Sequence, residues 1–115
     1  MDATHEGAPV RERDGVVIVD LPAQIDSTAE RALTDGYAEA AARGSGPILL
    51  NFSGVEFLSS TGIALIVGIL ARARKDGRRL TSCGLSDHYK EIFEITRLAD
   101  FMKIYADEAS AVSAR

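Results

Sequence analysis

The chain has very little of what most catalytic and metal sites require. Its 115 residues include one cysteine, Cys83, and two histidines, His5 and His88. A single cysteine excludes a disulfide within the chain and is typical of proteins from reducing compartments. Neither histidine has a second ligand residue at a metal-binding spacing, so we expect no metal site and no cofactor. Cys83 lies in the strand-like run RRLTSCG, which predicts a buried, unreactive thiol.

Long apolar runs and an excess of positive charge are also missing. The longest apolar run, residues 62–71, is about half of the roughly 20 residues that cross a bilayer. The first ten residues, MDATHEGAPV, have neither the basic nor the apolar region of a signal peptide. A net charge of −4 favours neither nucleic acid nor anionic lipid as a partner. We therefore expect a cytoplasmic protein without membrane insertion and without a nucleic-acid partner.

Motifs for catalysis are not found either. LSSTG lacks the G-x-S-x-G spacing of a nucleophile elbow, and two histidines offer little as a general base. GSGP, residues 44–47, lacks the lysine of a phosphate-binding loop and precedes a strand-like run instead of a helix. We expect that the chain is not an enzyme.

What is present is the composition and pattern of a small globular domain. With 46% apolar and 26% charged residues, the chain is long enough for one core and is interpreted as one domain, residues 1–115. Residues 1–13 are expected to form a weak edge strand or a flexible arm. Strand-like runs at 15–21, 46–53, 78–84 and 102–106 alternate with helical patterns at 27–44, 60–75, 86–101 and 107–115. This alternation predicts an α/β fold with a single sheet and crossover helices.

One stretch, FLSSTGIALIVGIL at residues 57–70, carries the main functional signal. Three hydroxyl residues, Ser59, Ser60 and Thr61, precede an apolar run without charge. Either Ser59 or Ser60 caps the helix, a contribution of about 1 kcal/mol, or a hydroxyl here is modified or bound by another protein. Gly62 in the first turn destabilises the helix by roughly 1 kcal/mol relative to alanine. A glycine at this position therefore predicts close approach by an outside molecule, for which a side chain would leave no room.

The helix that follows is apolar nearly all round. Ile63, Ile66, Val67 and Leu70 form one face, and Leu65 and Ile69 form another. A small domain has difficulty burying both faces, so part of this helix is expected to contact a partner. A phosphoryl group at the helix N-terminus would be favoured by the helix dipole and would add about −1.5 to −2 charges beside the apolar surface. That arrangement predicts a switch for binding.

Three stretches resemble STAS domains, and in particular the bacterial anti-sigma factor antagonists. They are VVIVDLPAQIDSTAERAL, PILLNFSGVEFLSSTGIALIVGILARARKDGRRL and HYKEIFEITRLADFMKIYADEASAV. The resemblance implies a STAS-type fold, a mixed sheet of four or five strands with about four helices packed mainly on one face. It also implies a regulatory protein that sequesters an anti-sigma factor.

The resemblance also implies a mechanism and site residues. The partner would be an anti-sigma factor and serine kinase of the GHKL type, which phosphorylates Ser60, and a cognate phosphatase would reverse the reaction; Ser59 and Thr61 are the alternative acceptors. Asp26 matches the family's acid after the first strand. Two family acids are replaced, by Ser59 before the acceptor and by Asn51 at the end of the preceding strand. The expected partner-binding residues, together with loop 20–26, are Asp26, Ser59, Ser60, Thr61, Gly62, Ile63, Leu65, Ile66 and Ile69.

The two replaced acids leave a second interpretation open. A STAS module that is not phosphorylated would serve as a scaffold or accessory subunit of a larger assembly, stressosome-like or involved in lipid transport. Both interpretations assign the chain to protein binding and not to catalysis.

Overall fold

The computed structural model describes residues 8–114, whose centre is a five-stranded mixed sheet. The strand order is β1-β2-β4-β6-β7, with β1 antiparallel to β2 and the remaining pairs parallel. The strands are β1 (Val10–Arg13), β2 (Val16–Asp20), β4 (Ile48–Asn51), β6 (Leu80–Cys83) and β7 (Lys103–Tyr105). The predicted mixed sheet is therefore confirmed. β1 is an edge strand of this sheet. Residues 1–7 of the predicted arm lie outside the described residues.

The apolar strands are covered on both faces of the sheet. In β2, all four valine and isoleucine residues from Val16 to Val19 are buried. Val17 and Val19 face the larger core, whereas Val16 and Ile18 face a smaller core that contains Ala111. Burial on both faces explains why the strand lacks the alternation of a strand with one solvated face.

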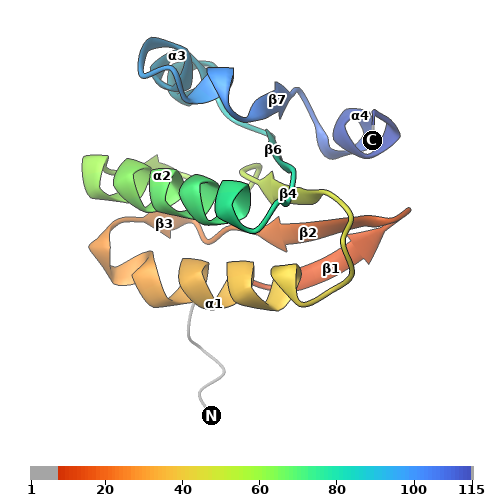
Figure 1. The fold of residues 1–115 in the computed structure, drawn as a ribbon. Helices are drawn as coiled ribbons and strands as arrows, with labels where there is room; N and C mark the ends of the chain where they lie inside the picture. Colours follow the sequence, from red (N-terminus) through yellow and green to blue (C-terminus); the bar gives the residue numbers. More distant parts are fainter. Residues whose placement is uncertain (1–7, 115) are drawn as a thin grey trace.

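Helices pack unequally on the two faces, as the sequence predicts. The helical elements are η1 (Ser27–Ala29), α1 (Glu30–Ala41), α2 (Ser60–Lys75), α3 (Asp87–Ile95), η2 (Leu98–Asp100) and α4 (Glu108–Ser113). Residues from α1, α2 and α3, such as Leu33, Ile66 and Phe93, belong to the larger core. Within residues 8–114, α4 is the helix that covers the opposite face, and Figure 1 shows it apart from the other three helices. No helix among residues 8–114 has both the length and the apolar composition to cross a membrane.

The expected helix over 86–101 is shorter in the structure. Ser86 caps α3 by accepting a hydrogen bond from the Tyr89 N–H, and α3 ends at Ile95. Arg97 has a φ of +69°, a left-handed conformation that breaks the helix. The break lets Leu98 and Met102 enter the core, where both are buried. Tertiary burial thus overrides the helical pattern at this point.

A second, two-stranded sheet brings two loops together at one end of α2. β3 (Gln24–Ile25) runs parallel to β5 (Phe57–Leu58), with Ile25 opposite Leu58. The sequence did not predict this pairing, because two residues are too few for a strand pattern. This pairing places Asp26 and Ser59, the residues that follow the two strands, at the start of neighbouring turns.

Candidate functional site

The three hydroxyl residues before α2 have different structural roles. Ser59 has an extended backbone and is the N-cap; its Oγ accepts a hydrogen bond from the Gly62 N–H at 3.0 Å. The Ser59 N–H donates to the carbonyl oxygen of Ile25 at 3.0 Å, which fixes the cap to β3. Of the two candidate caps, the structure therefore selects Ser59.

Ser60 is the first residue of α2, and its side chain is exposed. Within residues 8–114, its hydroxyl makes no hydrogen bond, unlike that of Ser59. Thr61 is exposed as well. The first turn of α2 thus presents two solvent-accessible hydroxyls at the positive end of the helix dipole, next to a third that is committed to capping.

Gly62 is required by an internal contact, contrary to the expectation of an outside molecule. A Cβ built on Gly62 would come within 2.0 Å of the Ile25 carbonyl oxygen and 2.8 Å of its carbon. No side chain fits at such distances, and Gly62 is itself buried. Gly62 lets α2 approach β3, and so holds the serine turn in place; its expected contact with a partner stays a prediction.

Asp26 lies in the neighbouring turn and caps η1. Its Oδ1 accepts hydrogen bonds from the Thr28 N–H at 2.9 Å and from the Thr28 hydroxyl at 2.5 Å. Both hydrogen bonds lower the pKa of the Asp26 carboxyl group, and the bond from the Thr28 hydroxyl has the larger effect. Asp26 is thus the N-cap of η1 and keeps a negative charge beside the turn that carries Ser59.

Loop 20–26 is less accessible than a docking loop would be. Leu21, Pro22 and Ile25 are buried, whereas Gln24 is exposed. Asp20, at its start, is held by Arg11 and so belongs to a different part of the surface. Docking by this loop stays a prediction, and the exposed Gln24 and the half-buried Asp26 are the positions that could serve it.

The apolar residues of α2 divide into a buried and an accessible set. Ile66 is fully buried and Ile69 is 5% exposed, because both pack into the larger core. Contact of these two residues with a partner stays a prediction, but their burial leaves almost no side-chain surface for it. Ile63 and Leu65 are half-buried, and Val67 is 44% exposed. The domain buries more of this helix than its size suggested, since α1, α3 and the sheet all contribute to one core.

Two aromatic residues beside the serine turn were not identified from the sequence. Phe57, in β5, is 48% exposed although it is large and apolar. The Tyr89 hydroxyl accepts a hydrogen bond from the Leu58 N–H at 3.0 Å, which connects α3 to the strand before Ser59. An exposed aromatic residue next to Ser60 is the type of side chain that anchors protein interfaces. Phe57 carries no sequence signal because its two-residue strand has no readable alternation.

Asn51, which replaces a family acid, connects the ends of three parallel strands. Its Nδ2 donates to the Asp20 carboxylate at 2.8 Å, and its Oδ1 accepts from the Ser53 N–H at 3.1 Å. The Cys83 thiol lies 3.6 Å from the same Oδ1. The amide uses both its donor and its acceptor, so Asn51 has a structural role in this chain.

An ion-pair cluster extends this network to the C-terminal helix. The Arg11 guanidinium donates to Asp20 at 2.7 and 2.9 Å and to Glu108 at 2.5 and 3.0 Å. Arg13 donates to Glu108 at 2.9 Å. The hydrogen bonds from Arg11 lower the pKa of Asp20 and lower that of Glu108 to about 2. This cluster fastens α4 to β1.

The remaining candidates are the cysteine and the two histidines, of which Cys83 and His88 lie within residues 8–114. Cys83 is fully buried, and burial is the main cause that raises its thiol pKa to about 11. A buried thiol with this pKa is a poor nucleophile at neutral pH, as predicted. No cluster of three metal-binding side chains occurs among the described residues. The His88 and Tyr89 rings are tilted by 58° with their centroids 5.0 Å apart, and His5 lies outside residues 8–114.

Comparison with known proteins identifies relatives by sequence. The family model described as "STAS domain" matches residues 8–111. An anti-sigma-B factor antagonist of Staphylococcus aureus is 36% identical over 61 residues, which cover 53% of this chain and 56% of that protein. The chain thus spans little more than half the length of this curated relative.

Solved structures share the fold at low sequence identity. An anti-sigma-factor antagonist (STAS) domain protein from Planctomyces limnophilus superposes with a TM-score of 0.79 and 23% identity, over 96% of this chain and 98% of that one. SpoIIAA of Bacillus, in its phosphorylated form, superposes with a TM-score of 0.68 and 19% identity, over 93% and 98% of the two chains. The family match over residues 8–111 and the shared five-stranded fold lead to one conclusion: the chain belongs to the STAS domain family.

Proposed function

We propose that this chain is an anti-sigma factor antagonist, a cytoplasmic protein-binding module that sequesters an anti-sigma factor and performs no catalysis itself. The partner would be a serine kinase of the GHKL type that phosphorylates Ser60, and a phosphatase would restore the binding form. The observation that carries the proposal is that Ser59 and Ser60, at the start of α2, have different roles. Ser59 provides the cap, so the exposed Ser60 hydroxyl is free for modification without loss of the helix end.

The surroundings of Ser60 suit a switch that acts by charge. Phe57, on the preceding strand, is half-exposed, and Ile63, in the same turn of α2, is half-buried. A phosphoserine would add about −1.5 to −2 charges next to this apolar surface and to Asp26. Binding a partner over the surface would desolvate that charge at a high cost, so phosphorylation would release the partner.

Binding and phosphorylation test the proposal together. A GHKL-type kinase encoded next to this gene would be titrated against wild type, Ser60→Ala and Ser60→Asp, with mass spectrometry after addition of ATP. We expect wild type and Ser60→Ala to bind alike, Ser60→Asp to bind at least tenfold more weakly, and phosphate to appear on Ser60. Phosphate on Thr61 would move the acceptor and keep the mechanism. Equal binding by all three proteins, without phosphate, would reject the switch.

A second candidate is the scaffold module that is not phosphorylated. It is favoured by Ser59 and Asn51, which replace the two family acids and are both occupied by structural hydrogen bonds. This candidate predicts stable binding to a larger assembly that neither ATP nor Ser60→Asp changes. Transporter genes in place of a kinase gene beside this one would favour it.

A further inference from the structure

An apolar groove lies between α2 and the segment that follows α3. It has a volume of about 380 Å³. One wall includes Ile63, Val67 and Ala71 of α2, and the other includes Leu98 and Phe101. Val67 is 44% exposed and Phe101 is 55% exposed, so the groove opens to solvent through large apolar side chains. Apolar surface of this kind is typical of an interaction site.

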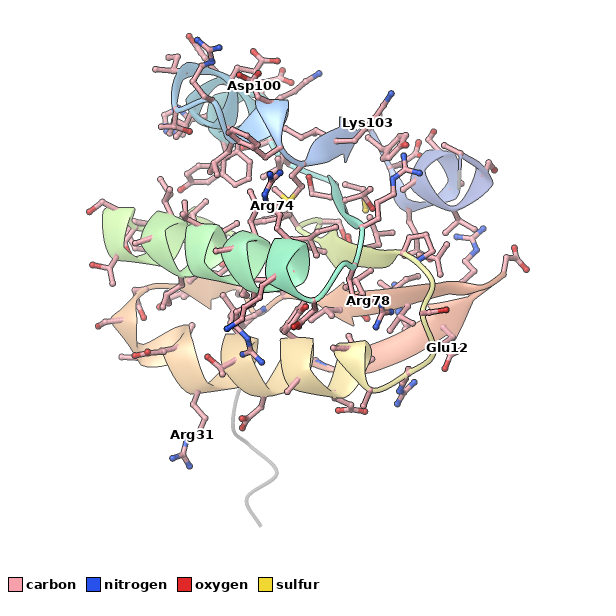
Figure 2. The ribbon with its side chains drawn as sticks, viewed as in Figure 1. Glu12, Arg31, Arg74, Arg78, Asp100 and Lys103 are labelled. Atoms are coloured by element: carbon pink, nitrogen blue, oxygen red, sulfur yellow. The ribbon has the colours of Figure 1, made fainter. Side chains whose placement is uncertain are left out.

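The rim of this groove is cationic, although the whole chain carries a net charge of −4. Arg74 and Arg97 line it, and none of its described lining residues is acidic. The Arg74 guanidinium lies 5.2 Å from the centre of the Phe101 ring, and Figure 2 shows this side chain directed from α2 toward the segment around Asp100. Arg97 is paired with Asp100 at 2.6 Å. Arg74 has no ion pair among residues 8–114, so its charge is available to a carboxylate from outside.

The length of the groove fits a helix. Ile63, Val67, Ala71 and Arg74 are spaced i, i+4, i+8 and i+11 along α2, which corresponds to about 16 Å or three helical turns. A helix laid in a groove uses anchors at i, i+3 or i+4, and i+7, which match such a surface. Ala71 is small, so the backbone of the incoming helix can approach α2 closely.

We propose that this groove binds an acidic amphipathic helix of the partner protein. Carboxylates along one edge of that helix pair with Arg74, and its apolar face covers Val67 and Phe101. Ile63 lies in the groove and in the first turn of α2, so the groove continues the surface around Ser60. The identity of the partner rests on the proposed function, whereas the chemistry of the helix rests on the groove alone.

A second copy of this chain fits the groove less well. In a two-fold symmetric dimer the same surface meets itself, so the cations Arg74 and Arg97 of each protomer would find no acidic lining residue on the other. Two like charges without a counter-charge oppose that contact, and an acidic partner removes the conflict.

Synthetic helices test the groove without any knowledge of the natural partner. The probe is a stapled amphipathic helix of about 12 residues with leucines at i, i+4 and i+7 and glutamates on its flanks. The control peptide has lysine in place of each glutamate. In a ¹⁵N-edited NMR titration, we expect the glutamate peptide to shift the amides of Val67, Thr96 and Phe101. The lysine peptide should bind at least tenfold more weakly.

Two substitutions on α2 give a matched pair for this titration. Arg74→Glu reverses a charge in the groove and should weaken the glutamate peptide at least tenfold. Arg72→Glu makes the same change on the same helix, but Arg72 lies over the Tyr37 ring and does not line the groove. It should change affinity less than threefold.

Several results would overturn the proposal. They are equal binding of the two peptides, equal weakening by the two substitutions, or no shift of the groove amides. Sodium laurate shifting these amides where the glutamate peptide does not would identify a lipid site, and dimerisation through the groove, measured by light scattering, would identify a second copy.

The kinase titration separates this proposal from the Ser60 switch. Weak kinase binding by Arg74→Glu, with normal binding by Ser60→Asp, would keep the groove and reject the switch. Normal kinase binding by Arg74→Glu, with weak kinase binding by Ser60→Asp and no binding of the glutamate peptide, would reject the groove and keep the switch.

Discussion

The carbonyl oxygen of Ile25 occupies the space that a side chain at Gly62 would need, because a Cβ at Gly62 would lie 2.0 Å from it. The same oxygen accepts the Ser59 N–H at 3.0 Å. One backbone carbonyl in β3 therefore sets both the cap of α2 and the distance of the helix from the loop. The position of the Ser60 hydroxyl depends on this contact.

Gly62→Ala is expected to destabilise the protein by about 1–3 kcal/mol, because β3 or α2 must move to admit the methyl group. Gly68→Ala is the control on the same helix: a Cβ there meets nothing within 4 Å, so the change should stabilise the helix by up to about 1 kcal/mol. Urea denaturation of both variants measures the difference. Equal effects of the two substitutions would mean that the contact with Ile25 does not constrain α2.

Ser59→Ala and Ser60→Ala should differ although they are adjacent. Ser59→Ala removes the cap and should cost about 1 kcal/mol. Ser60→Ala removes an exposed hydroxyl without a hydrogen bond and should lie within about 0.5 kcal/mol of wild type. Chemical denaturation gives both values. A larger loss for Ser60→Ala would assign the cap to Ser60 and undermine its role as a free acceptor.

The fold follows from strong local patterns, and the sequence predicted it well. The β-branched run Val16–Val19 and the apolar run at 48–50 are strands, and α2 spans Ser60–Lys75 close to the expected 60–75. The caps at Ser86 and Asp107 are local in the same way, because each side chain accepts from the N–H three residues later. Each of these features depends on neighbours in sequence.

The parts of the site that were missed depend on contacts between distant residues. From the sequence, Gly62 predicted close approach by an outside molecule. The group that approaches it is the Ile25 carbonyl, 37 positions earlier in the chain, and a local pattern cannot reveal that contact. The helical pattern marks Ile66 and Ile69 as apolar, but it cannot say how much of that surface α1 and α3 cover. Phe57 lies in a two-residue strand pairing, and Arg97 adopts a left-handed backbone conformation. Neither feature produces a periodic pattern in the sequence.

Ser82→Ala is expected to stabilise the protein. Ser82 is fully buried in β6, and its Oγ is the one buried side-chain polar atom without a hydrogen-bond partner among residues 8–114. An unpaired buried hydroxyl costs about 1–3 kcal/mol by mutational data, so its removal should raise the free energy of unfolding by about 1 kcal/mol. Thermal and urea denaturation provide the measurement. A loss of stability would indicate that the hydroxyl has a partner, such as a buried water.

Glu108→Gln should change how stability depends on acid. The hydrogen bond from Arg11 lowers the folded pKa of Glu108 to about 2, from an ordinary value of 4.5. A lowered carboxyl pKa contributes stability above about pH 4.5, and that contribution is lost as the pH falls toward 2. Because Arg11 is 42% exposed, solvent screening limits the contribution to up to about 1 kcal/mol. Urea denaturation from pH 7 to pH 2 should show Glu108→Gln below wild type at neutral pH and equal to it near pH 2; a constant difference would contradict the ion pair.

Asn51→Asp restores a family acid and should reverse the sign of this pH dependence. The new carboxylate would replace an amide donor that lies 2.8 Å from the Asp20 carboxylate, so two negative charges would share one site. Their repulsion raises the pKa of one carboxyl group above its unfolded value, and Arg11, already shared with Glu108, offsets only part of it. A raised carboxyl pKa means that the folded state binds more protons, so this contribution to stability falls as the pH rises from about 4 to 7. Urea denaturation of Asn51→Asp should therefore show its deficit against wild type shrinking as the pH is lowered through this range. A deficit that stays the same at pH 7 and pH 4.5 would show that the two carboxylates do not interact, and that Asn51 is not needed as the donor to Asp20.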